Sequence, residues 1–338
     1  AVPDGAGLTW DVAWDDREER VHHARFPGLY DGVTGIAWTL LTYGDARDDA
    51  EALAAGRRGL DAVVARLGPL AGGPSGTFVP GGALDVIAGS AGVVLALLDG
   101  HRVTGEGSYR DAAVAAADGL LAAAERTPQG WRWPSRIGGD RVYTGFSHGV
   151  AGIATALAQT YAATGEARFL AAAQEGARWL ATTDLCVHDA RGTAWRHDTT
   201  SSPDDRLWEG WCHGPAGTCR LHLLLYSLTG DPRALAVAED GARYLLAATD
   251  PTKDRAASGF WAPSLCCGAA GVGTFLLDLA RVTGNPAYTT HAAAIVGFLE
   301  RTATRPTTDQ ACWSLSGQPE GKHGKLWHGT NLMTGQGG

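Results

Sequence analysis

The sequence predicts an all-α protein built as a two-layered ring of helical hairpins. Three observations favour this fold class. A Gly-x-x-Gly turn followed by an apolar stretch occurs six times in the 338 residues. Alanine-rich segments with apolar residues at helical spacing lie between the turns. Hydrophobic residues make up 45% of the chain, which is ample for a sizeable core. Hairpins repeated in this way close most simply into a ring with an inner and an outer layer of helices.

The turns recur with a period of about sixty residues. Their first glycines are spaced 57, 60, 65, 54 and 67 residues apart, and they are Gly32, Gly89, Gly149, Gly214, Gly268 and Gly335. Glycine accounts for 47 residues, about twice its usual share, and recurrent turns explain much of this excess.

We expect an inner helix after each turn and an outer helix in each alanine-rich segment. The segment 150–164 is apolar nearly all round, as expected for an inner helix that is covered on both sides. The outer helices are predicted at 46–67, 109–126, 167–182, 232–248 and 286–302. Each is followed by a short segment built on aromatic residues, namely Phe78, Trp131 and Trp133, Trp195, Phe260 and Trp261, and Trp313.

No linker-like composition interrupts the series, so residues 1–338 are predicted to form a single domain. Both ends look truncated. Trp10 belongs to an aromatic segment without a preceding outer helix, and the turn at Gly335 lacks its inner helix. We therefore expect a longer polypeptide or further helices at both ends.

Composition argues against several classes of protein. The net charge is −8 and no run of lysine or arginine occurs, which argues against a nucleic-acid partner. No 18-residue apolar run predicts a transmembrane segment, and the features of a signal peptide are missing. Six cysteines in so long a chain do not resemble a disulfide framework. A reducing compartment, the cytoplasm, is expected.

Three cysteines stand at equivalent positions of two repeats. Cys212 precedes a glycine turn in the stretch GWCHGPAG, and Cys266 with Cys267 precedes the next turn in SLCCGAAG. Thiolates are soft ligands, and three of them would leave the fourth tetrahedral position of Zn²⁺ open for a substrate. The start of a helix also favours the thiolate form. The alternative is that these cysteines are small buried hydrophobes, which is the preferred interpretation for Cys186, Cys219 and Cys312.

Two further residues are candidates for proton transfer. His148, in the turn GFSHGVAG, occupies the place that Cys212 approaches in its own repeat. Closure of the ring would therefore bring His148 to the same end of the inner barrel as Cys212. There it could act as a general acid or base. Asp85, four residues before Gly89, could orient it or accept a proton, or could instead cap a helix. His213 follows Cys212 and is expected to line the site; the alternative is a fourth protein ligand, which would close the zinc site.

Taken together, the turns resemble those of the lanthionine synthetase C family, the cyclases that close thioether rings in lanthipeptides. The resemblance spans essentially the whole chain and implies an α/α toroid, usually of seven hairpins. It implies zinc ligands at Cys212, in a Trp-Cys-x-Gly motif, and at Cys266 with Cys267, where the family usually has Cys-His. His148 and Asp85 match the catalytic positions. Arg206 is the one nearby candidate for an arginine that some members carry before the first zinc cysteine, and it is predicted, with His213, to line the substrate site. The motifs are GLYDGVTG, DVIAGSAG, GFSHGVAG, GWCHGPAG, SLCCGAAG and NLMTGQGG.

The family implies addition of a peptide cysteine to dehydroalanine or dehydrobutyrine, which forms lanthionine or methyllanthionine. The implied partners are a dehydrated precursor peptide and a dehydratase or kinase-lyase region of the same or another chain. Two alternatives stay open. One is a related module that binds a peptide or thiol without cyclising it. The other is an α/α-toroid glycosidase, which would need paired carboxylates, although Asp85 is the only obvious one.

Overall fold

The computed structural model describes residues 2–5, 7–10, 12–15, 21–24, 27–30, 32–67, 82–135, 139, 141–182, 184–307 and 310–313. Phe78 and the turn at Gly335 lie outside these residues. The chain divides into two compact units, the first Ala1–Val142 with His148–Trp179 and the second Tyr143–Ser147 with Leu180–Gly338. The single domain inferred from the sequence stays a prediction.

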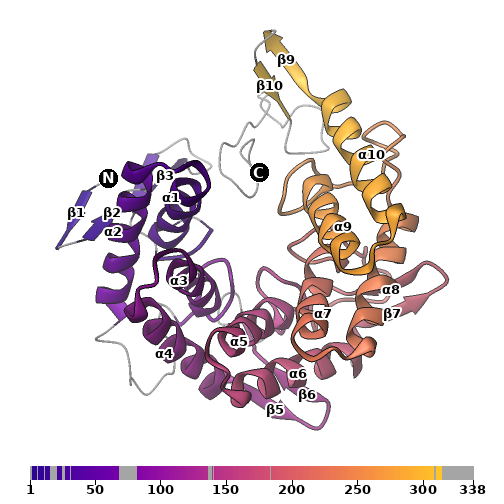
Figure 1. Ribbon diagram of the computed structural model, residues 1–338. Helices are drawn as coiled ribbons and strands as arrows, with labels where there is room; N and C mark the ends of the chain where they lie inside the picture. The colour runs from indigo at the N-terminus through magenta and orange to yellow at the C-terminus, as the bar shows by residue number, and fades with distance from the viewer. Residues whose placement is uncertain are drawn as a thin grey trace. The chain divides into compact units, whose positions relative to one another are not determined.

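Inner and outer helices alternate along the described chain, as predicted (Figure 1). In the first unit the inner helices α1, α3 and α5 pack in sequence order, and in the second α7 packs on α9. Four hairpins pack in pairs: α1 on α2, α3 on α4, α7 on α8, and α9 on α10. The inner helices are α1 (Val33–Arg47), α3 (Ser90–Thr104), α5 (Val150–Thr164), α7 (Pro215–Thr229) and α9 (Ala269–Thr283). The outer helices are α2 (Ala50–Leu67), α4 (Gly107–Ala123), α6 (Ala167–Thr182), α8 (Pro232–Ala248) and α10 (Pro286–Thr302).

The glycine turns are built by a close backbone approach. In each turn that the structure describes, the first glycine is the extended N-cap of an inner helix, as Gly214 is for α7. The second glycine lies against a carbonyl six residues earlier, so a Cβ atom at Gly217 would stand 1.8 Å from the Trp211 oxygen. The same contact recurs at Gly35, Gly92 and Gly271. Glycine is required at these positions because any side chain would push the turn open.

The aromatic segments with Trp131, Trp195 and Trp313 form or follow short antiparallel hairpins, which the sequence did not predict as strands, whereas Phe260 and Trp261 lie outside any strand. Trp131 lies on β6 (Gly130–Arg132), Trp133 follows it, and Trp195 ends β8 (Gly192–Trp195). The indole N–H of Trp133 donates to the Leu120 carbonyl at 2.8 Å, near the end of α4. Trp195 and Trp313 make the same bond to Leu180 of α6 and Leu299 of α10. Each indole thus donates to a carbonyl at the end of an outer helix, where the helix itself supplies no backbone N–H partner.

The strands of these hairpins pair two by two. Those nearest the chain start are β1 (Val2–Asp4) with β2 (Gly7–Thr9), and β3 (Val12–Asp15) with β4 (Val21–Ala24). The others are β5 (Glu125–Thr127) with β6 (Gly130–Arg132), β7 (Cys186–Asp189) with β8 (Gly192–Trp195), and β9 (Thr304–Thr307) with β10 (Gln310–Cys312).

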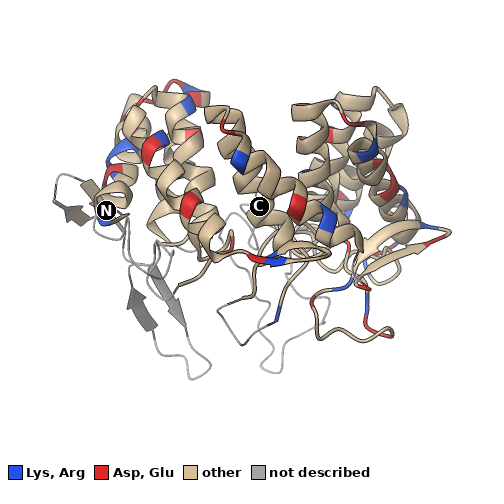
Figure 2. Cartoon of the chain, turned by 90° about the horizontal axis from the view of Figure 1, so that it is seen from below, with Lys and Arg blue, Asp and Glu red and all other residues tan. Residues whose placement is uncertain are grey.

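Charged residues of both signs are interspersed along the helices (Figure 2). Ion pairs link neighbouring helices within a unit: Arg220 of α7 pairs with Asp278 of α9 at 2.7 Å, and Arg168 of α6 pairs with Asp118 of α4. Among the described residues no helix is both long enough and apolar enough to cross a bilayer.

The glycine contact gives a first prediction. Gly217→Ala should destabilise the protein by about 2 kcal/mol or more, because its Cβ would overlap the Trp211 carbonyl. Gly107→Ala is the matched control, since a Cβ at Gly107 meets no atom within 4 Å. The free energy of unfolding in urea distinguishes the two variants. Equal stability of both would show that the turn relaxes to admit a side chain.

A buried histidine gives a second prediction. His222 of α7 is 5% exposed and stacks on Trp195 at 6.1 Å, and burial lowers its pKa to about 4. The unfolded chain binds a proton near pH 6.5 while the folded chain resists it, so stability should fall as the pH drops from about 6.5 to 4, by about 3 kcal/mol in all. His222→Leu should flatten that part of the pH profile. An unchanged profile in the variant would assign the loss to other groups.

Candidate metal centre and proton-transfer pair

Asp85 and His148 form a hydrogen-bonded pair within the first unit. His148 Nδ1 lies 2.7 Å from Asp85 Oδ2. The Asp85 side chain is 6% exposed, and its Oδ1 accepts the Ala88 N–H at 2.9 Å, while the His148 side chain is 33% exposed. A carboxylate only accepts hydrogen bonds, so Nδ1 carries the hydrogen and Nε2 is the basic nitrogen of the neutral ring.

The hydrogen bond from the Ala88 N–H also shows how Asp85 relates to the start of α3, where the sequence allowed it to be a helix cap. The N-cap of α3 is Gly89, not Asp85. Asp85 stabilises the turn before α3 with one oxygen and holds His148 with the other. The sequence suggested these as alternatives, and the structure shows that the side chain makes both contacts.

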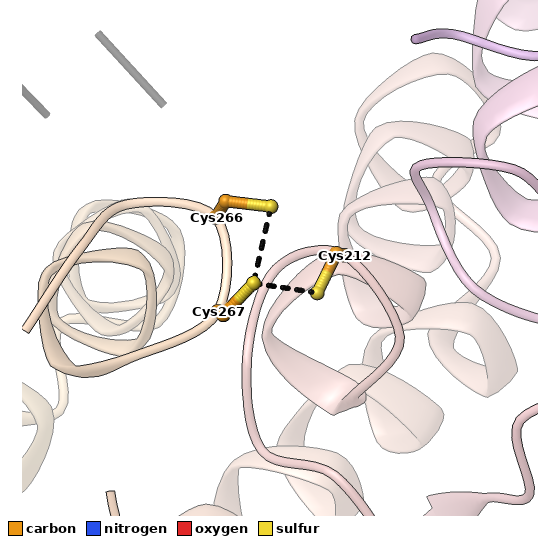
Figure 3. A group of neighbouring side chains, drawn as sticks. All are labelled: Cys212, Cys266 and Cys267. Carbon is orange, nitrogen blue, oxygen red and sulfur yellow. Dashed lines mark hydrogen bonds between the residues drawn. The ribbon is translucent and has the colours of Figure 1, made fainter. Parts of the chain in front are cut away.

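The three cysteines meet within the second unit (Figure 3). Their sulfurs all lie within 4.8 Å of one another, with Cys212 Sγ 3.6 Å from Cys267 Sγ and Cys267 Sγ 3.4 Å from Cys266 Sγ. Two turns bring them together: the Cys212 N–H donates to the Cys266 carbonyl at 3.0 Å. The Cys212 carbonyl in turn accepts the N–H and the hydroxyl of Ser147, both at 3.1 Å.

The cluster fits a tetrahedral ion with soft ligands. Two sulfurs bound to one zinc ion at about 2.3 Å lie roughly 3.8 Å apart. The observed separations of 3.4 and 3.6 Å are close to this value, and all three cysteines are free thiols. Three sulfurs and no fourth protein ligand among the described residues would leave one position open.

Crowding and burial raise the pKa values of the cluster thiols. Hydrogen bonds with Cys266 and Cys267, together with burial, raise the pKa of the Cys212 thiol. At Cys267 the bond with Cys212 lowers the pKa, but the bond with Cys266 and burial outweigh it and raise the pKa to about 12. Crowding and desolvation of the three thiols thus oppose the thiolate form that a helix start favours. A bound cation would have to supply the missing positive charge.

The two residues predicted to line the site have well-defined surroundings. The ring centre of His213, the residue after Cys212, lies 4.0 Å from the ring centre of His197 and 6.1 Å from that of Tyr143. Arg206 pairs with Glu209 at 3.1 Å and lies over Trp208 and Trp261 at 5.4 and 5.5 Å from their ring centres.

Sequence reasoning missed Glu209 and the pair of His197 with Asp198. Burial raises the pKa of Glu209, against the opposing effects of the Trp261 N–H and the Arg206 guanidinium. His197 Nδ1 lies 3.0 Å from Asp198 Oδ2, and Asp198 is 2% exposed. The one available signal was Glu209 itself, a lone charge between two tryptophans just before Cys212. Nothing in the sequence brings residues 197 and 213 together.

Comparison with known proteins decides the family. The sequence model of the family "Lanthionine synthetase C-like protein" matches residues 71–338. The chain belongs to the lanthionine synthetase C-like family. No curated protein matches it in sequence.

Several solved structures have a fold similar to that of this chain. Nisin cyclase aligns with a TM-score of 0.63 at 17% identity, over 82% of this chain and 70% of that one. A sugar epimerase from a ruminal bacterium aligns with a TM-score of 0.60 at 11% identity, over 90% of this chain and 83% of that one. A GH76 alpha-mannanase from Bacteroides thetaiotaomicron aligns with a TM-score of 0.54 at 15% identity, over 80% of this chain and 74% of that one. The predicted fold class, an all-α α/α toroid, is confirmed. Because the similar proteins carry different activities, the fold alone does not give the activity.

The cysteine cluster of this lanthionine synthetase C-like chain gives a third prediction. Cys212→Ala and Cys267→Ala should lose a bound divalent metal ion, because each removes one of three sulfurs. Cys219→Ala should keep it, since Cys219 lies apart, bonded to the Val237 carbonyl at 3.8 Å. Metal content per chain and far-UV circular dichroism check this. Unfolding of the first two variants would mark the site as structural instead.

Proposed function

We propose that the chain is a zinc-dependent lanthipeptide cyclase that adds peptide cysteine thiols to dehydroalanine or dehydrobutyrine. The observation that carries the proposal is the set of three sulfurs from two glycine turns in a lanthionine synthetase C-like protein. The likeness to nisin cyclase supports a dehydrated peptide as the substrate. The reducing cytoplasm, where thiols stay free, is the proposed compartment.

Zinc at Cys212, Cys266 and Cys267 would supply a Lewis acid with one open position, which lowers the pKa of a peptide thiol and makes thiolate available at neutral pH. The protein contributes a rigid arrangement, because the bond between the Cys212 N–H and the Cys266 carbonyl fixes the two turns against each other. Three cysteine sulfurs would leave the metal more electron-rich than two sulfurs and a histidine imidazole, the ligand set usual in the family.

His148 is proposed to transfer the proton that completes the addition. Attack of the thiolate on the β-carbon leaves an enolate, and carbon protonation at its α-position requires an acid. His148 protonated at Nε2 could give that proton, while Asp85 on Nδ1 stabilises the imidazolium and fixes the ring. That this pair and the cysteine cluster serve one reaction is part of the proposal.

Arg206 is proposed to act through Glu209 and not on the peptide directly. Its guanidinium pairs with the buried Glu209 carboxylate, which in turn accepts the Trp261 N–H and raises the pKa of Cys267. The pair therefore holds the loop before Cys212 and offsets a negative charge beside the sulfurs. His213 keeps its predicted place as a lining residue.

The alternatives make different demands on these residues. A module that only binds peptides would not need His148 to be held by a buried carboxylate. A glycosidase would need two carboxylates flanking one sugar bond, whereas Asp85 is committed to His148 and to the Ala88 N–H. Both arrangements favour the cyclase.

Cyclisation of dehydrated precursor peptides tests the proposal. The metal-loaded protein is mixed with a panel of such peptides, and loss of free thiol at unchanged peptide mass is followed by alkylation and mass spectrometry. Elemental analysis of the same protein should find zinc. A folded, zinc-loaded protein that binds these peptides but never consumes their thiols would support the binding module.

The proton-transfer step gives a fourth prediction. His148→Asn should retain the metal and slow cyclisation by roughly a hundredfold or more, the usual scale for a positioned acid or base. His101→Asn is the control, because His101 lies in the last turn of α3, where its Nδ1 is 3.0 Å from the Glu106 carbonyl. Turnover that survives in the His148 variant would leave this histidine a lining residue.

A further inference from the structure

We propose that Cys186 is a second reactive thiol, activated by His188 and Asp240, which forms mixed disulfides with small disulfide molecules. This site does not belong to the cysteine cluster and does not depend on the proposed cyclase reaction. It lies on the hairpin of β7 and β8 where the hairpin packs against α8.

The site is a chain of contacts across three elements. Cys186 and His188 are two residues apart on β7, so their side chains leave the same face of the strand. Cys186 Sγ lies 3.5 Å from His188 Nε2, and His188 Nδ1 lies 2.7 Å from the Thr193 hydroxyl of β8. That hydroxyl also bonds Asp240 of α8, whose Oδ2 is 3.7 Å from Nδ1.

Hydrogen-bonding capacity fixes the direction of every bond in this chain. The Asp240 carboxylate can only accept, so the single Thr193 hydrogen points to it. The Thr193 oxygen must then accept from Nδ1–H of His188. Nε2 of the neutral ring therefore has a lone pair, and the Cys186 thiol donates to it. This is the arrangement of a nucleophile, its base and a group that orients the base.

Burial opposes ionisation of the thiol and sets how it must react. Desolvation raises the pKa of Cys186 to about 11, so the sulfur is protonated at neutral pH. The proton must then pass to Nε2 of His188 as attack begins. Asp240 stabilises the resulting imidazolium through Thr193, although it shares its charge with Arg243.

Access separates Cys186 from the buried Cys212, Cys219 and Cys266, whereas Cys267 is also partly exposed but belongs to the cysteine cluster. The His188 side chain is 66% exposed and Cys186 is partly exposed, so a small molecule can reach the sulfur. Cys219 is fully buried. Cys212, Cys266 and Cys267 hydrogen-bond one another.

The reaction balances without a further reagent. The Cys186 proton moves to His188, and the sulfur attacks one sulfur atom of a disulfide RSSR. The S–S bond breaks, and the leaving thiolate takes the proton from the imidazolium as RSH. Cys186 is oxidised to the mixed disulfide and one half of RSSR is reduced to the thiol.

The test measures the reaction of the metal-loaded protein with 2,2′-dithiodipyridine at neutral pH, with the modified residue identified by peptide mass spectrometry. We expect label on Cys186 and none of that label in Cys186→Ser. His188→Gln should slow labelling of Cys186 by about tenfold or more, because the amide cannot take the proton. Cys219→Ala should leave the rate unchanged.

Asp240→Asn separates activation from simple exposure. It should slow labelling of Cys186 because the amide stabilises the imidazolium less, and thermal unfolding verifies that the variant is folded. Equal labelling rates in the wild type and in folded His188→Gln would overturn the proposal, as would protection of Cys186 while Cys212 or Cys267 reacts. Neither the rate nor the labelled residue depends on cyclase activity, so the result stands apart from the proposed function.

Discussion

The structure depends on one repeated contact, the approach of a glycine Cα to a carbonyl six residues earlier. At Gly217 and Gly271 this contact folds the chain back on itself directly before α7 and α9. The residue pairs just before the N-cap glycines are thereby fixed at the starts of two neighbouring helices. Those positions hold the three cysteines, so the contact that shapes the repeat also places the sulfurs.

Assembly of the sulfurs has an electrostatic cost. Three thiols packed together and buried resist ionisation, and the pKa values of Cys212 and Cys267 rise accordingly. The same crowding that disfavours three separate thiolates suits one divalent ion, whose charge offsets theirs. Glu209 adds a buried negative charge nearby, and Arg206 partly compensates it.

A carboxylate orients a histidine in three places. Asp85 holds His148 directly, Asp198 holds its neighbour His197, and Asp240 reaches His188 through Thr193. Each arrangement places the hydrogen on Nδ1 and the lone pair on Nε2. The three histidines differ in the group that lies beside Nε2, and that group determines which reaction the histidine can assist. For His188 it is a thiol.

The sequence by itself determined the repeat, the alternation of helices and the three cysteines, because these follow from local turn chemistry and helical periodicity. The outer helix predicted at 232–248 is α8, and the inner helix predicted at 150–164 is α5. Only the tertiary structure decided the raised pKa of Cys267, the role of Trp133 in closing a helix end, and the relay from Cys186 to Asp240. Burial and hydrogen bonds between residues far apart in the chain set these properties, and such distances leave no periodic signal in a sequence.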